Sequence, residues 1–161
     1  MKRYVIVGGG PAGVSAATAI RGKDAGVEIF IFDRDQDLPY YRTELDTYIG
    51  GSTSDAQMPL HPATYYQEQR IIVRLRTVVT KLQPTERWVE LEGAERVPYD
   101  MLLLAPGSFP LTVNWPGDQV SGVTTMRTWE DARGLIRQLT GTDRSVVVVG
   151  GGVLGLILAE G

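Results

Sequence analysis

The sequence predicts an α/β fold in which helices cover a parallel sheet, accompanied by a β-rich layer. Two observations predict it. First, a short apolar run at Arg3–Val7 stops at glycine, an Ala-rich helical stretch follows at Pro11–Lys23, and a second apolar run covers Val27–Phe32. The second run is too apolar for an exposed edge, as expected of a parallel strand covered on both faces. Second, the same pattern of strand, glycines and helix begins again at Ser145.

The remaining elements are predicted from local patterns. Thr128 is expected to cap a late helix, with Asp131 as the acid of a capping box. The stretch 106–122, which holds several prolines and glycines, is the clearest break in composition and a natural domain boundary. In order, the patterns predict a helical turn at 44–48, an irregular stretch at 52–62, a helix at 63–69, alternating β structure at 71–82, strands at 88–91 and 101–105, and a helix at 129–139.

Composition excludes several classes of function. The chain has 161 residues, no cysteine and a net charge of -3, with its positive charges scattered along the sequence. These features argue against nucleic-acid binding, disulfides, thiolate metal sites and a catalytic thiol, and no metal-ligand spacing is present. The N-terminus holds neither a signal-peptide core nor a membrane span, so we expect a cytoplasmic location.

A glycine-rich turn after the first strand predicts dinucleotide binding. Residues 8–13, Gly-Gly-Gly-Pro-Ala-Gly, fit the pattern G-x-G-x-x-G, and Asp33 follows 20 residues after the last glycine, at the end of the second strand. Gly8 would allow the tight turn, Gly10 the approach of a pyrophosphate, and Gly13 close packing of helix on sheet. The amides of a helix that starts near Pro11 and Ala12 would stabilise the phosphates. The alternative, a turn with no ligand, does not explain why all these features occur together.

A second fingerprint appears late in the chain. The valines 146–149 form a predicted strand, and Gly150, Gly152 and Gly155 occupy the glycine positions of the same pattern before an apolar helix from Leu156. Its ribose-binding acid would lie about 20 residues beyond the last glycine. The printed sequence stops before that position.

Two fingerprints on either side of a β-rich middle resemble the flavoprotein pyridine nucleotide-disulfide oxidoreductase superfamily. Within this superfamily the sequence most resembles the ferredoxin, rubredoxin and nitrite reductase type, because Pro39-Tyr40-Tyr41-Arg42 and Leu45 match "P-Y-x-R-x-x-L". Residues 97–107 resemble the second FAD signature, and residues 126–132 resemble the segment before the nicotinamide domain. The resemblance implies a Rossmann-like FAD-binding domain at 1–110, a crossover at 111–144 and the start of an NAD(P)-binding domain at 145–161.

The same resemblance implies cofactors and site residues. FAD would bind the first fingerprint and NADH or NADPH the second, and electrons would pass through the flavin to a redox protein or a small acceptor. It leaves the catalytic residues, the acceptor and the choice between NAD and NADP unspecified. The residues implied for FAD are Asp33 on the ribose, Arg34 beside the adenine, Arg42 near the pyrophosphate, Val79 at the adenine edge, and Ala105 and Gly107 near the flavin phosphate.

Several residues depart from the family pattern. The absence of cysteine disfavours the branch that reduces disulfides or peroxide through a cysteine near Thr43. Asp46 and Thr47 stand where related reductases often carry Ser-Lys, so catalysis by a lysine beside the flavin is not expected. Pro106 replaces a usual threonine, and Ile157 replaces a glutamate that many relatives carry.

Two other hypotheses remain beside the leading one. The chain could be a non-catalytic nucleotide-binding fragment or a subunit completed by another polypeptide. Apolar residues 146–158 would then predict self-association. A flavin monooxygenase or a thioredoxin-reductase-like enzyme also uses two fingerprints, although the segment at 39–42 argues against both.

His61, which precedes a proline, is interpreted as a solvated turn residue.

Overall fold

The protein is described from a computed structural model, which covers residues 1–111, 115–141 and 145–160. Its backbone divides into two compact units, each described here by itself. The first unit comprises Met1–Tyr40 and Pro59–Gly107, and the second comprises Tyr41–Met58 and Ser108–Gly161.

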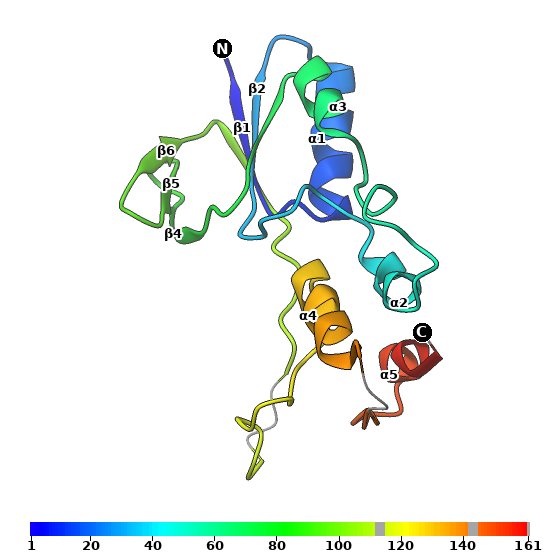
Figure 1. Ribbon diagram of the computed structural model, residues 1–161. Coiled ribbons are helices and arrows are strands. Elements are labelled where there is room, and N and C mark those ends of the chain that lie inside the picture. Colours follow the sequence, from blue (N-terminus) through cyan, green and yellow to red (C-terminus); the bar gives the residue numbers. More distant parts are fainter. Residues whose placement is uncertain (112–114, 142–144, 161) are drawn as a thin grey trace. The chain divides into compact units, whose positions relative to one another are not determined.

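A four-stranded parallel sheet forms the centre of the first unit, in the order β3-β2-β1-β7. Figure 1 shows β1 and β2 of this sheet beside α1. One face packs against α1 and α3 through a core that includes Ile6, Val14, Ile31 and Tyr66. The predicted β-α-β unit is confirmed, and its apolar strands pair in register over their whole length. The elements are β1 (Arg3–Val7), α1 (Pro11–Lys23), β2 (Glu28–Phe32), α3 (Ala63–Glu68), β3 (Ile71–Arg74) and β7 (Met101–Leu104).

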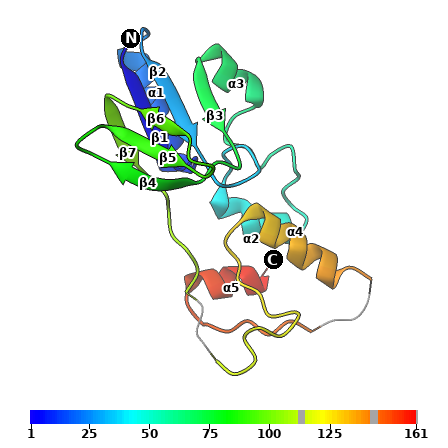
Figure 2. The same cartoon turned by 90° about the vertical axis from the view of Figure 1, so that its left-hand side faces the viewer.

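The other face of the sheet packs against a small antiparallel sheet, which confirms the predicted β-rich layer (Figure 2). Its order is β4-β5-β6, with β4 at Val79–Gln83, β5 at Trp88–Leu91 and β6 at Arg96–Pro98. Val5 and Phe32 from the parallel sheet share a buried cluster with Val89 and Leu91. Successive residues of a strand point to opposite faces, so neighbouring residues of β1 enter different cores.

The predicted β stretch at 71–82 is wrong in one respect, because it is two strands in two different sheets. β3 ends at Arg74 and β4 begins at Val79. Between them Arg76 has a φ of 50°, a left-handed conformation that interrupts the extended chain. The alternating pattern of side chains continues across the interruption and therefore concealed it.

The second unit is mainly helical. It contains a 3-10 turn η1 (Arg42–Glu44) and the helices α2 (Leu45–Ile49), α4 (Trp129–Leu139) and α5 (Val153–Glu160). The predicted capping box is present, because the Thr128 hydroxyl accepts from the Asp131 N–H at 3.1 Å and Asp131 accepts from the Thr128 N–H at 2.7 Å. The ring edge of Tyr48 on α2 contacts the ring of Trp129 on α4, with centroids 5.7 Å apart.

The strand predicted at 146–149 is not formed. No strand is assigned in this described segment, and the exposed fractions of Val146 to Val149 run from 42% to 84%. A β-strand needs a hydrogen-bonded neighbour, and no strand of the described residues pairs with it. The helix α5 begins at Val153, three residues earlier than expected. The predicted boundary after 110 stays a prediction, and that after residue 144 falls outside the described residues.

Candidate dinucleotide-binding site

The first fingerprint forms a tight turn that only glycine fits at its first position. Gly8 has a φ of 108°, and its N–H donates to the Phe32 carbonyl at 2.8 Å. A Cβ on Gly8 would overlap the backbone carbonyl oxygen of Ala105. Glycine is therefore required here both for its conformation and for the close approach of the chain after β7.

The other two pattern glycines have different roles. A Cβ on Gly13 would overlap the carbonyl oxygen of Gly8, so this glycine lets α1 pack closely on the turn. A Cβ on Gly10 would meet no atom within 4 Å. Packing therefore does not require glycine at position 10, and the open space beside its backbone suits a ligand.

The open space lies at the N-terminus of α1. Gly10 is the N-cap of this 13-residue helix, Pro11 is its first residue, and no side chain caps it. The first N–H groups of a helix have no acceptor within the helix, and together with the helix dipole they favour a negatively charged group. Ala12 lies in this first turn, and the residues present fit a pyrophosphate.

Asp33 lies beside the glycine turn, as the sequence predicts for the ribose-binding acid. It is only 9% exposed. Its carboxylate accepts hydrogen bonds from the Gly9 N–H at 2.6 Å and from the Asp35 N–H at 3.0 Å. Each carboxylate oxygen has a second lone-pair direction, so these bonds leave acceptor capacity for ribose hydroxyls. The sequence did not predict that Asp33 already bonds to the glycine turn.

Two loops lie side by side next to Asp33. The Thr77 N–H donates to the Asp33 carbonyl at 2.8 Å, and the Arg76 N–H donates to the Asp35 carbonyl at 2.9 Å. These bonds bring the start of β4, where Val79 lies, close to the exposed Arg34 segment. The roles of Arg34 and Val79 on the adenine side stay predictions.

The chain after β7 also reaches the glycine turn. The Ala105 N–H donates to the Val7 carbonyl at 2.8 Å, which extends the parallel pairing of β7 with β1. Gly107 has a φ of 72°, a conformation that favours glycine. The structure therefore brings Ala105 together with Gly8, Gly10, Gly13 and Asp33.

The other predicted site residues belong to the second unit. The Arg42 guanidinium donates to the Arg127 carbonyl at 3.1 Å. The second fingerprint repeats the turn of the first, since a Cβ on Gly155 would overlap the Gly150 carbonyl oxygen and Gly150 has a φ of 126°. The Leu156 N–H donates to the Gly152 carbonyl at 3.0 Å, as in the first turn of α1.

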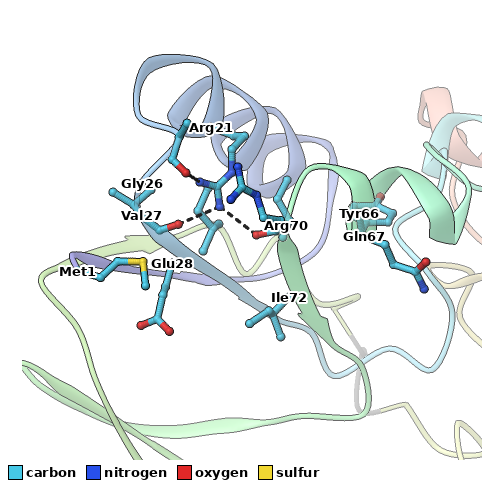
Figure 3. A pocket seen from close by; sticks show the side chains of 12 residues that line it. Met1, Arg21, Gly26, Val27, Glu28, Tyr66, Gln67, Arg70 and Ile72 are labelled. Atoms are coloured by element: carbon cyan, nitrogen blue, oxygen red, sulfur yellow. Dashed lines mark hydrogen bonds between the residues drawn. The ribbon is translucent and has the colours of Figure 1, made fainter.

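A cavity of about 510 Å³ lies at the amino ends of β2 and β3, whereas the fingerprint follows the carboxyl end of β1. Figure 3 shows Arg21 beside it, with dashed bonds to backbone groups. The Arg21 guanidinium donates to five backbone carbonyls, those of Asp24, Ala25, Val27, Gln69 and Arg70. Sequence reasoning missed this arginine, although its spacing from Val14 and Ala17 places it on the buried face of α1.

Charged groups near the fingerprint are paired at the surface. The Arg74 guanidinium, at the end of β3, contacts both carboxylate oxygens of Glu95 at 2.8 and 2.9 Å. These bonds lower the pKa of Glu95 and raise the pKa of Arg74.

Across residues 1–111, 115–141 and 145–160, no group of three or more His, Cys, Asp or Glu side chains could hold a metal ion. Nor does this part of the chain contain a helix of the length and apolarity needed to cross a membrane.

Comparison with known proteins shows the family of the chain. The family model "Pyridine nucleotide-disulphide oxidoreductase" matches residues 2–160. The rubredoxin-NAD(+) reductase of Pseudomonas putida is 35% identical over 157 residues, which cover 97% of this chain and 40% of that protein. The chain thus spans well under half the length of this relative.

Solved structures of reductases also match this chain. The NADH:rubredoxin oxidoreductase of Clostridium acetobutylicum matches with a TM-score of 0.89 and 28% identity, over 98% of this chain and 40% of that chain. The reductase of a covalent putidaredoxin reductase-putidaredoxin complex matches with a TM-score of 0.84 and 29% identity, over 98% and 39% of the two chains. The Rossmann-like fold predicted from the sequence is confirmed by these neighbours. The chain belongs to the pyridine nucleotide-disulphide oxidoreductase family.

Proposed function

We propose that this chain is the FAD-binding part of an oxidoreductase that passes electrons from NADH or NADPH through FAD to an acceptor. The observation that carries the proposal is the open space at Gly10, beside an uncapped helix N-terminus and the buried carboxylate of Asp33. An anionic pyrophosphate and an adenosine ribose are the groups that such a site recognises.

Each residue of the site would contribute binding or orientation. The first-turn amides of α1 would hold the pyrophosphate, with Gly10 leaving room for it. Asp33 would accept from the ribose, and Arg34 and Val79 would lie on the adenine side. FAD, when bound, would supply the chemistry of hydride and electron transfer, and these residues would hold and orient it.

The second fingerprint supports nicotinamide binding, with Gly150, Gly152 and Gly155 as its glycines. We propose Arg42 on the flavin side and Ala105 and Gly107 at the flavin phosphate, as in the family pattern. The relatives named above act on rubredoxin or form a complex with putidaredoxin, which supports a small redox protein as the acceptor. A cytoplasmic location fits such a partner.

Flavin binding by the purified chain tests the proposal. We expect it to bind FAD, and we expect Gly10→Val to lose FAD while keeping the fold, because a Cβ there has no protein atom within 4 Å and the side chain would occupy the proposed ligand space. Gly22→Val is the matched control, since Gly22 lies on the same helix with no atom within 4 Å of its Cβ position. Stoichiometric FAD in the Gly10→Val variant would contradict the site.

Turnover requires a separate measurement. The 161 residues include a ribose acid after the first fingerprint and none after the second. Because the chain spans 40% of the length of its rubredoxin-NAD(+) reductase relative, we expect the purified 161 residues to bind FAD without oxidising NADH. Reduction of a dye by NADH and the purified chain would refute this expectation.

We also propose that the chain self-associates through apolar residues of the second unit. Val147, Val153, Leu154 and Leu156 are between 64% and 84% exposed. Exposed apolar clusters of this kind favour association. Sedimentation of a clean monomer at all concentrations would contradict this proposal.

A further inference from the structure

The backbone and the side chain of Asp33 are both held by hydrogen bonds within the chain. Its backbone N–H donates to the Arg74 carbonyl at 3.0 Å, and its carbonyl accepts from Thr77 at 2.8 Å. Its two carboxylate oxygens accept from Gly9 and from Asp35. Backbone and side chain are thus both held, and the Gly9 bond is charge-assisted, short and buried.

The Asp33 side chain is the nearest neighbour of position 9. The pattern G-x-G-x-x-G leaves the second position open to any residue, and Gly9 does not have a left-handed conformation that would require glycine. A Cβ at this position would nevertheless overlap Oδ2 of Asp33 and lie 3.2 Å from its Cβ and Cγ. The three nearest atoms all belong to Asp33. A side chain at position 9 would therefore require the Asp33 carboxylate to shift, which would disturb its hydrogen bond to the Gly9 N–H.

We infer that Asp33 is a positioning residue for the phosphate-binding turn, in addition to any contact with the ribose, and that Gly9 is the partner through which it acts. The inference rests on the proposed function, since it assigns a second role within the same site. Three consecutive glycines have more backbone freedom to lose than other residues, so a fixed anchor on the middle one restricts the turn. The anchor lies one residue before Gly10, where the ligand space opens.

Amide hydrogen exchange tests this inference without a ligand. We expect Asp33→Ala to speed exchange at the Gly9 N–H by about tenfold or more, since a charge-assisted bond is lost. The core strands β1 and β2 should keep their protection. Asp24→Ala is the matched control, because Asp24 accepts from the Gly26 N–H at 2.9 Å at the other end of α1. Unchanged exchange at Gly9 in Asp33→Ala would overturn the inference.

Ligand binding separates the positioning role from ribose recognition. The probes are ADP and 2′,3′-dideoxy-ADP, which lacks the ribose hydroxyls. We expect Asp33→Ala to weaken 2′,3′-dideoxy-ADP by about tenfold and ADP by at least as much, because the misplaced turn affects the phosphates of either probe. Loss of affinity for ADP alone would show that Asp33 acts only on the ribose, against the inference. If the unaltered chain bound neither probe, the proposed function would fail, and the exchange measurement would still decide the positioning role.

A double-mutant cycle tests the pair directly. Gly9→Ala should displace the Asp33 carboxylate and weaken the binding of 2′,3′-dideoxy-ADP by about tenfold. In the Asp33→Ala background, where Oδ2 and Cγ are absent, the same change should weaken binding by less than about twofold. Equal losses in both backgrounds would overturn the coupling. Should Asp33→Ala fail to fold, Asp33→Asn replaces it in the exchange experiment, since an amide offers one acceptor oxygen for two backbone N–H groups. Unchanged exchange at both Gly9 and Asp35 would then count against the inference.

Discussion

Gly13 lies so close to the carbonyl oxygen of Gly8 that a Cβ on Gly13 would overlap it. Gly155 has the same relation to Gly150 in the second fingerprint. In both turns the obstacle is a backbone atom, which cannot rotate away as the end of a side chain can. The third glycine of each fingerprint is therefore a packing requirement of the protein itself.

We predict that Gly13→Ala lowers the free energy of unfolding by about 1 to 3 kcal/mol, the usual cost of forcing an extra methyl group into a packed site. Gly22→Ala on the same helix should have no such cost, because no atom lies within 4 Å of its Cβ position and alanine favours the helix. Urea unfolding followed by circular dichroism compares the two. Equal stability of the two variants would show that the turn can relax around the methyl group.

The buried guanidinium of Arg21 is a second group that the fold requires. Its five donors all bond to backbone carbonyls, and the residue is 8% exposed. We predict that Arg21→Lys lowers the free energy of unfolding by about 2 kcal/mol or more, because an ammonium has three donors and leaves buried carbonyls without partners.

The matched control is Arg137→Lys on α4. Arg137 bonds to Glu130 at 2.7 Å, but its side chain is 64% exposed, so the loss should stay below about 1 kcal/mol. Urea midpoints of the two variants give the comparison. A larger effect at Arg137 than at Arg21 would contradict the structural role of the buried guanidinium.

The ion pair of Arg74 and Glu95 predicts a small dependence of stability on acid pH. Hydrogen bonding from Arg74 holds the pKa of the Glu95 carboxyl below its usual value of 4.5. A carboxyl whose pKa is lower in the folded state stabilises the fold above the unfolded-state pKa, and this contribution disappears as the pH falls through the folded-state pKa.

We therefore expect Glu95→Gln to lower the urea midpoint slightly at neutral pH and to have no effect well below 4.5, where the unaltered carboxyl is protonated as well. The side chain of Glu95 is 53% exposed, so solvent screens the pair and the effect at neutral pH is small. A difference between the two proteins that persists unchanged in acid would have another cause.

The parts of the fold that the sequence predicted are those fixed by neighbours along the chain. The strand Arg3–Val7 and the helix Pro11–Lys23 follow directly from apolar runs, glycine and proline, and the capping box follows from Thr128 and Asp131. The division of 71–82 into two strands depends on the left-handed conformation of Arg76. Arginine rarely adopts this conformation, so nothing in the sequence signalled a turn there.

Other features depend on partners distant in sequence. The valines 146–149 have the composition of a strand. A β-strand forms only when its backbone hydrogen-bonds to a neighbouring strand, and none of the described residues pairs with these valines. Asp33 was predicted from its distance to the fingerprint. Its bond to Gly9 was not, because the pattern treats that position as free. Arg21 bonds to carbonyls at 69 and 70, which only the folded chain brings near.

Tyr66 gives the last prediction. It is 3% exposed in the core beneath α1, and its hydroxyl has no hydrogen-bond partner among the described residues. A buried polar group without a partner costs about 1 to 3 kcal/mol. We predict that Tyr66→Phe leaves the free energy of unfolding unchanged or raises it by about 1 kcal/mol, since only the unpaired hydroxyl is removed.

Tyr65→Phe is the matched control and should have the opposite effect. The Tyr65 hydroxyl shares a hydrogen bond with Thr18 at 2.9 Å, and its loss should lower the free energy of unfolding by about 1 kcal/mol. Urea unfolding of both variants at neutral pH gives the two signs. A destabilised Tyr66→Phe variant would mean that the hydroxyl has a partner in solution.

Alkaline pH separates the two tyrosines further. Burial, and to a lesser degree Tyr65, raises the pKa of Tyr66 from 10.0 to about 12. Between these values the unfolded chain has lost this proton while the folded chain keeps it, so the stability of the unaltered protein falls as the pH rises through this window. Tyr66→Phe removes the group and should flatten that fall, measured as urea midpoints at about pH 8 and about pH 11. An equally steep fall in the variant would assign the alkaline loss to other groups.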